Sequence, residues 1–107
     1  LVQLLLFKGL SINKLKQEVR LKDRRVVLST TEYEALVLFA ENPGRNLDRD
    51  FLVENLRGIR WQSYDRSIDV LVSRLRLKLG DTPSKTSYIK TVHGVGYMFI
   101  GEPKNKE

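Results

Sequence analysis

Residues 65–80 constrain the fold of this chain most strongly, because their pattern predicts one helix with two different faces. At about 100° per residue, one stripe is apolar and requires a core: Ile68, Val72, Leu75 and Leu79, with Leu71 at its margin. The opposite side is basic but also carries apolar residues: Arg66, Val70, Ser73, Arg74 and Leu77, flanked by Ser67 and Lys78. Asp65 is predicted to cap the first turn and Gly80 to end the helix.

The outer side of this helix fits two interpretations. A face rich in Lys and Arg is often only solvated surface, but such a surface has little use for Val70 and Leu77. A helix in a DNA major groove uses both residue types, because arginine contacts phosphates or guanine and a small apolar group contacts a thymine methyl. The helix alone leaves both interpretations open.

The composition is that of a basic chain with one domain. Its 107 residues are enough for one modest core and too few for two domains. The formal charge of +6 suits a polyanionic partner, which could be DNA, RNA or anionic lipid. The apolar residues 1–7 are too few to span a bilayer and are interpreted as a strand. The chain starts at Leu1 rather than Met, which suggests a fragment of a longer protein.

Catalysis and metal binding are not predicted. The chain has one histidine, no cysteine and no cluster of His, Asp or Glu at ligand spacing. We therefore expect no catalytic residue, no metal and no cofactor, and the lack of cysteine fits a reducing cytosol. The acidic residues are predicted to have structural roles: Glu32, Asp48 and Asp65 as helix caps, and Asp69 as a partner for a nearby arginine within the domain. A membrane-surface role is not expected, because the core needs the apolar stripe of 65–80.

The first half of the chain predicts a small sheet followed by two helices. Strand-like runs at 4–7, 10–13, 18–22 and 25–28 alternate with polar turns, which predicts an antiparallel sheet over 1–28. Ser29 and Glu32 form a capping-box pattern that opens a helix ending at Asn42-Pro43-Gly44. Asp48 is predicted to cap a second, short helix that Gly58 closes.

The second half predicts a helix-turn-helix followed by a hairpin. The loop 58–64 displays Ile59, Trp61 and Tyr64, which either pack back on the helices or contact a protein partner. After a linker at 81–87, strands at 88–92 and 97–100 form a hairpin in which Gly94 and Gly96 are predicted to supply positive φ. Residues 102–107 are expected to be a mobile tail.

Together these elements predict an α+β fold in a single domain, residues 1–107. Its parts are an N-terminal four-stranded antiparallel sheet over 1–28, a three-helix core with a helix-turn-helix over 29–80 and a C-terminal hairpin over 88–100. The last helix of the core is 65–80, and 101–107 is the tail.

Four segments in this order resemble the C-terminal effector domain of OmpR/PhoB-type two-component response regulators. They are Leu28-Ser-Thr-Thr-Glu-Tyr-Glu-Ala-Leu36, Leu47-Asp-Arg-Asp-Phe-Leu52, Asp65-Arg-Ser-Ile-Asp-Val70 with Ser73-Arg-Leu-Arg76, and Ile89-Lys-Thr-Val-His-Gly-Val-Gly-Tyr97. The resemblance covers nearly the whole chain and is greatest to the RstA branch of the family. It implies a winged helix-turn-helix fold, in which 65–80 is the recognition helix for the major groove and the hairpin 88–100 is the wing at the adjacent minor groove. It also implies a bacterial, cytoplasmic transcription regulator that binds double-stranded DNA.

The same resemblance implies partners. In such proteins an N-terminal receiver domain is phosphorylated by a sensor kinase, and two effector domains then bind direct-repeat half-sites. Both the receiver domain and the kinase lie outside this chain, which is expected to be monomeric alone and paired on promoter DNA. The family also implies a possible contact between RNA polymerase and the loop that contains Ile59, Arg60, Trp61 and Gln62.

Carried over by position, the resemblance implies roles for individual residues. The expected base contacts are Arg74 and Val70. The expected DNA backbone contacts are Arg66, Ser67, Ser73, Arg76, Lys78, Lys90 and Thr91. The expected minor-groove contacts of the wing are His93 and Gly94.

Two positions depart from the family pattern. His93 stands where the family most often has arginine, and is either a groove contact or a solvated loop residue. Arg57 replaces a common tryptophan, and Trp61 could supply the missing bulk. An alternative is a winged helix that binds protein or RNA, although the deep, narrow major groove of A-form RNA does not admit a helix.

Overall fold

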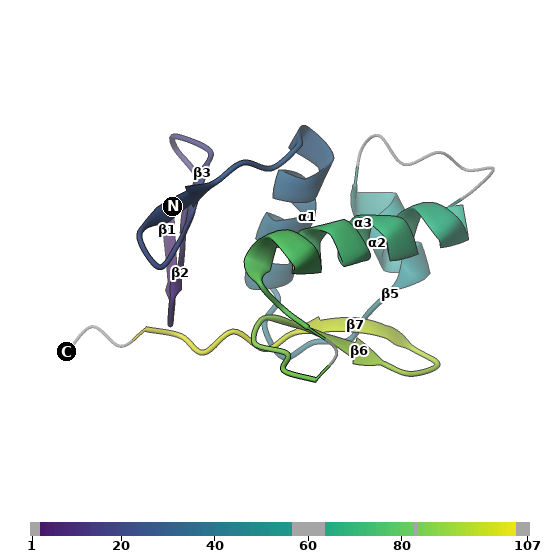
Figure 1. Cartoon of the computed structure of the whole chain (residues 1–107). Coiled ribbons are helices and arrows are strands. Elements are labelled where there is room, and N and C mark those ends of the chain that lie inside the picture. The colour runs from purple at the N-terminus through teal and green to yellow at the C-terminus, as the bar shows by residue number, and fades with distance from the viewer. Residues whose placement is uncertain (1–2, 57–63, 83, 105–107) are drawn as a thin grey trace.

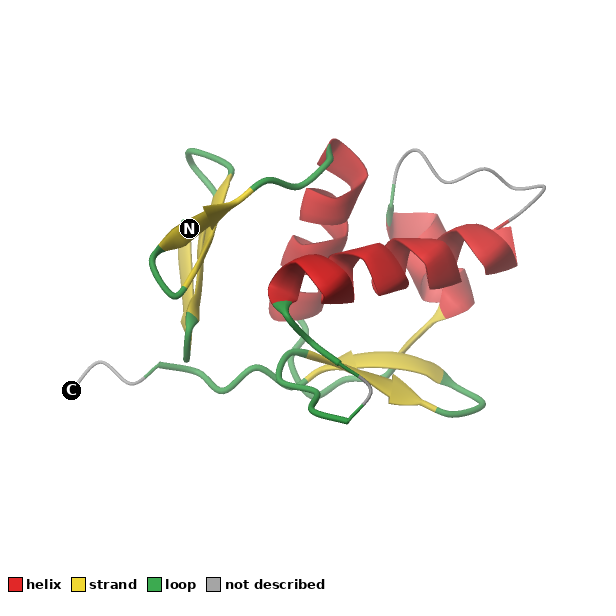
Figure 2. Cartoon of the chain, in the orientation of Figure 1, coloured by secondary structure: helices red, strands yellow, loops and turns green. Residues whose placement is uncertain are grey.

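The computed structural model describes residues 3–56, 64–82 and 84–104, with only the backbone of 64–67. The order of elements in Figures 1 and 2 confirms the predicted α+β architecture. Their bounds are β1 Leu4–Phe7, β2 Leu10–Asn13, β3 Glu18–Leu21, β4 Arg24–Val26, α1 Thr30–Ala40, β5 Leu47–Asp48, α2 Arg49–Asn55, α3 Tyr64–Leu79, β6 Ile89–Val92 and β7 Gly96–Phe99.

The N-terminal sheet is an antiparallel meander in the order β1-β2-β3-β4. One register row joins Leu5, Ile12, Val19 and Val26, and this row supplies apolar side chains to the core. The observed bounds of the third and fourth strands differ from the predicted ones. Lys22 and Asp23 both adopt positive φ and form the turn, so β3 ends earlier and β4 begins and ends earlier than expected.

Both predicted N-terminal caps of α1 and α2 are confirmed. The Ser29 hydroxyl accepts a hydrogen bond from the Glu32 N–H, and the Glu32 carboxylate accepts one from the Ser29 N–H. Asp48 accepts the N–H of Phe51 at 2.8 Å. The end of α2 was predicted wrongly, because the helix stops at Asn55 and the extended Leu56 follows it, before Gly58.

The predicted buried stripe of α3 is confirmed: Ile68, Leu71, Val72, Leu75 and Leu79 all lie in the core. The helix ends as expected, since Gly80 has a φ of +79°. The N–H groups of Gly80 and Asp81 bond to the carbonyls of Leu77 and Arg76 in a Schellman motif. Its start differs from the prediction. The helix begins at Tyr64, so Asp65 lies inside the first turn rather than at the cap.

The wing contains a strand that the sequence did not reveal. The hairpin β6–β7 is joined by β5, giving the sheet order β5-β7-β6. Gly94 has the expected positive φ of +78°, but Gly96 does not. A Cβ at Gly96 would lie 2.2 Å from the Leu47 carbonyl oxygen, so the glycine is needed for the close approach of β5.

The segments on either side of the hairpin are fixed by long-range hydrogen bonds. In the predicted linker, the buried Asp81 carboxylate accepts the N–H groups of Ser87, Tyr88 and Ile89. The predicted mobile tail is ordered in its first part, because the Lys8 N–H donates to the Glu102 carbonyl and the Lys104 N–H donates to that of Leu6. The described tail therefore runs beside β1.

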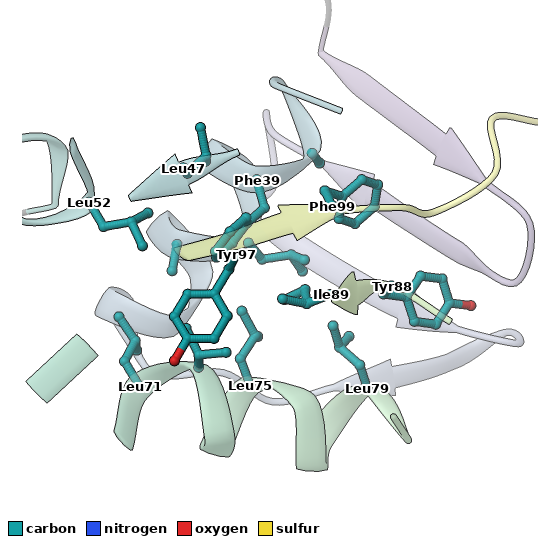
Figure 3. Close-up of a cluster of buried hydrophobic side chains, with 14 of the residues drawn as sticks. Phe39, Leu47, Leu52, Leu71, Leu75, Leu79, Tyr88, Ile89, Tyr97 and Phe99 are labelled. Carbon is teal, nitrogen blue, oxygen red and sulfur yellow. The ribbon is translucent and has the colours of Figure 1, made fainter. Parts of the chain in front are cut away.

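The core lies where α1, α2 and α3 meet the wing sheet. Figure 3 shows Leu71, Leu75 and Leu79 directed from α3 toward the strands that carry Ile89 and Tyr97. This packing buries one side of α3 and leaves its other side exposed, as the predicted stripe required.

Candidate nucleic-acid interface

The outer face of α3 consists of Val70, Ser73, Arg74 and Leu77. All four side chains are exposed, with Val70 at 39% and Leu77 at 79%. Within the described part of the chain, Arg74 has neither a hydrogen bond nor an ion pair. The outer face thus presents one free guanidinium beside two apolar groups.

Arg76 lies two residues from Arg74 but is bound inside the domain. Its Nε donates to the Ile89 carbonyl oxygen at 3.1 Å, and its Nη2 donates to Thr91 Oγ1 at 2.5 Å. The guanidinium also lies 5.3 Å from the ring centre of Tyr97. Arg76 therefore fastens α3 to the wing strands β6 and β7.

Asp69 makes a second link beneath the outer face. Its Oδ1 accepts Arg49 Nη2 at 2.8 Å and the Tyr97 hydroxyl at 2.6 Å. The Tyr97 hydrogen bond, helped by Arg49, lowers the pKa of Asp69 despite partial burial. Burial and the same carboxylate raise the pKa of Tyr97. The predicted pairing of Asp69 with an arginine is confirmed, and it joins α3 to α2 and β7.

Lys78 makes a third link, on the side of α3 next to α1. Its Nζ donates to Glu32 Oε1 at 2.7 Å. Burial of Glu32 opposes its ionisation, but hydrogen bonds from Lys78 and from Ser29 outweigh that penalty and lower the pKa of the carboxyl. The ammonium group that was predicted to contact DNA is thus already paired.

A groove of about 490 Å³ separates the C-terminal half of α3 from the start of the wing. Its lining includes five predicted site residues and one outer-face residue without an assigned role: Ser73, Arg76, Lys90, Thr91 and His93, with Leu77. Asp81, Thr82 and Thr86 complete the lining. The groove brings helix and wing residues together, although they are far apart in sequence.

The other predicted site residues lie away from the groove or outside the described residues. Val70, Arg74, Lys78 and Gly94 do not line the groove. Gly94 is exposed at the turn between β6 and β7. The side chains of Arg66 and Ser67 are outside the described residues, as is the predicted polymerase-contact loop with Ile59, Arg60, Trp61 and Gln62.

Leu77 and Asp81 were not predicted as site residues. The helical wheel already placed Leu77 on the outer face, and its exposed position was the signal that could have identified it. Asp81 carried no such signal, because its partners are backbone N–H groups six to eight residues away.

Metal-binding clusters and membrane-spanning helices are both absent from the described part of the chain. Among the residues that the structure describes, no group of three or more His, Cys, Asp or Glu side chains could hold a metal ion. None of the described helices has the length and apolarity needed to cross a membrane.

Comparison with known proteins places the chain in a family. Residues 23–99 match the family described as "Transcriptional regulatory protein, C terminal". The chain is 42% identical over 93 residues to the transcriptional regulatory protein RstA of Escherichia coli (strain K12), covering 87% of this chain and 39% of that protein. It is 47% identical over 73 residues to the transcriptional regulatory protein AruR of Pseudomonas aeruginosa, covering 68% and 30% respectively. The chain thus spans well under half the length of these curated relatives.

Solved structures of related proteins share the fold of this chain. The crystal structure of the Klebsiella pneumoniae RstA DNA-binding domain in complex with RstA box matches with a TM-score of 0.83 and 39% identity. The match covers 92% of this chain and 98% of that one. By sequence and by fold, the chain belongs to the family of C-terminal winged-helix domains of OmpR/PhoB-type transcriptional response regulators.

Proposed function

We propose that this chain binds double-stranded DNA sequence-specifically, as the effector domain of a two-component response regulator that controls transcription. In this proposal α3 enters the major groove and the β6–β7 wing lies at the adjacent minor groove. The carrying observation is the outer face of α3, where an unpaired Arg74 lies beside exposed Val70 and Leu77. A face used only by solvent would not need these apolar groups.

The proposal divides contacts between bases and backbone. Arg74 reads guanine and Val70 meets a thymine methyl, because these side chains are exposed and unengaged. The backbone contacts are Arg66, Ser67, Ser73, Lys90 and Thr91, and the minor-groove contacts are His93 and Gly94. Arg76 and Lys78 were also predicted to contact the backbone, but in this proposal they act through their bonds to the wing and to Glu32. Thr91 can serve two partners, since its Oγ1 accepts from Arg76 and its hydroxyl proton remains available for a phosphate oxygen.

The wider assignment follows from the family. The chain works with a receiver domain and a sensor kinase outside residues 1–107, and it binds direct repeats as a pair while remaining monomeric alone. RNA polymerase contacts the loop 59–62. The protein is cytoplasmic, is not an enzyme and needs no cofactor. Two findings support these points. The chain belongs to the family, and it matches only 39% of the length of its relative RstA, which leaves room in such proteins for a receiver domain.

Selection of binding sites from a random duplex library tests the proposal, followed by a salt titration of the winner against random DNA. We expect a short motif repeated in direct orientation about one helical turn apart. No enrichment above a steep salt-dependent background would contradict sequence-specific binding. Equal competition by duplex RNA would favour the RNA-binding alternative, and failure to bind either nucleic acid would favour a protein partner.

A further inference from the structure

Leu77 is an exposed leucine in an otherwise polar setting. Its exposure is 79%, the same as that of Val27 and close to the 77% of Leu15, but the three residues differ in their surroundings. Leu77 lines the groove between α3 and the wing together with Arg76 and Lys90. A polyanion drawn to this groove would therefore meet Leu77 as well as the cations.

The spacing of Leu77 relative to Val70 relates it to the rest of the outer face. Residues seven apart on an α-helix lie within about 20° of each other and about 10.5 Å apart along the axis. The rise of duplex DNA is about 3.4 Å per base pair along its axis, so the two side chains are about three base pairs apart when the axis of α3 runs along that of the duplex. Arg74 lies between them on the same exposed face.

One base feature in the major groove suits an aliphatic side chain. The edges of guanine, cytosine and adenine present hydrogen-bond donors and acceptors, whereas thymine adds a C5-methyl group. A leucine placed against any of the polar edges would remove their water without replacing its hydrogen bonds. A thymine methyl is thus the base group that gains from contact with Leu77.

We infer that Leu77 is a second apolar specificity determinant, which contacts a thymine methyl about three base pairs from the thymine met by Val70. Arg74 reads a guanine between the two thymines. This inference rests on the proposed function, since it requires α3 to lie in the major groove. It assigns to DNA an apolar side chain that has no packing role in the core.

Replacement of thymine by deoxyuridine tests the inference, because it removes the methyl group and keeps the Watson–Crick edge. Each thymine of the selected site is replaced in turn, and Kd is measured for the wild-type chain, Leu77→Ala and Val70→Ala. For the wild type we expect about fourfold weaker binding at each of two positions about three base pairs apart. Leu77→Ala should lose sensitivity at one position and keep it at the other, and Val70→Ala should do the reverse.

Leu15→Ala is the matched control, because Leu15 is as exposed as Leu77 but lies in the turn between β2 and β3. It should bind like the wild type and remain sensitive to both deoxyuridines. Three results would overturn the inference: deoxyuridine effects that persist at both positions in Leu77→Ala, an equal loss of affinity for all sequences in Leu77→Ala, or a selected site without two such thymines. The first two would leave DNA recognition intact, whereas failure to select any site would remove the proposed function as well.

Discussion

Two groups of side chains on α3 lie close together and behave in opposite ways. The outer face, Val70, Ser73, Arg74 and Leu77, is exposed. The anchoring group, Asp69, Arg76 and Lys78, is bound to β7, β6 and α1 respectively, and Asp69 also to α2. The comparison shows that charge on a recognition helix has two uses. Arg74 is left exposed, while Asp69, Arg76 and Lys78 fix α3 relative to α1, α2 and the wing.

The contrast between Arg74 and Arg76 follows from helical geometry. Two residues apart on an α-helix is about 200° of rotation, so the side chains leave on opposite sides. Arg76 turns toward the wing and finds the Ile89 carbonyl and Thr91, whereas Arg74 turns toward solvent. Identical chemistry thus yields a guanidinium bound to the wing in one case and an exposed guanidinium in the other.

The largest expected effect is on Arg76→Ala. The change removes two hydrogen bonds and leaves the carbonyl of the buried Ile89 unpaired. We expect a loss of about 1–3 kcal/mol in the free energy of unfolding, and Tm should fall by roughly 4–8 °C per kcal/mol. Thermal unfolding followed by circular dichroism measures this change.

Arg76→Lys sharpens the result, because it keeps the charge but cannot reproduce the two directed hydrogen bonds. If Arg76 positions the wing, Arg76→Lys should remain destabilised. Wild-type stability in both variants, combined with weaker DNA binding, would instead place Arg76 among the simple phosphate contacts and erase the contrast with Arg74.

The next largest effect is on Arg74→Ala, and it concerns binding rather than stability. Since Arg74 is exposed and unpaired within the described residues, the free energy of unfolding should change by no more than about 0.5 kcal/mol. Affinity for the selected site should fall by about 1–3 kcal/mol with relaxed specificity at one base pair. Fluorescence anisotropy with selected and random duplexes measures both, and an equal loss on the two duplexes would contradict base reading.

Much of this arrangement could be predicted, because local patterns determined it. The apolar stripe of 65–80, the Ser29–Glu32 capping box and the Asp48 cap depend on residues within one or two turns of each other. Such patterns predicted the fold and the separation of a buried from an exposed side of α3.

The remaining features depend on partners that are distant in sequence. The strand β5 is only two residues long, and Gly96 is required because Leu47, nearly fifty residues earlier, passes close to it. Likewise, the charge of Lys78 was visible, but its pairing with Glu32 on another helix was not. Composition and periodicity carry no information about such contacts. The sequence alone therefore could not distinguish basic side chains that are bound within the domain from those that are exposed.

A smaller effect separates two lysines that were both predicted to contact the DNA backbone. Lys90 is exposed on the lining of the groove, whereas Lys78 is paired with Glu32. Lys90→Ala should reduce the slope of log K against log salt by about 0.9 and leave stability unchanged. Lys78→Ala should keep the slope and lower stability by at most about 1 kcal/mol. Equal slope changes in the two variants would show that Lys78 leaves Glu32 to meet a phosphate.

The smallest effect at neutral pH concerns Glu32→Gln, which keeps the hydrogen bond to the Ser29 N–H but loses the charge that Lys78 pairs with. The pKa of Glu32 is lowered below its ordinary value of 4.5. The ionised form therefore stabilises the fold above pH 4.5, and this contribution is lost as the pH falls through the folded pKa.

Urea unfolding across about pH 3–7 should show a wild-type advantage that is constant above pH 4.5 and disappears in acid. Asp69, whose pKa is also lowered, should retain its own acid sensitivity in both proteins. A wild-type advantage that persisted undiminished in acid would mean that Glu32 contributes through packing rather than through its charge.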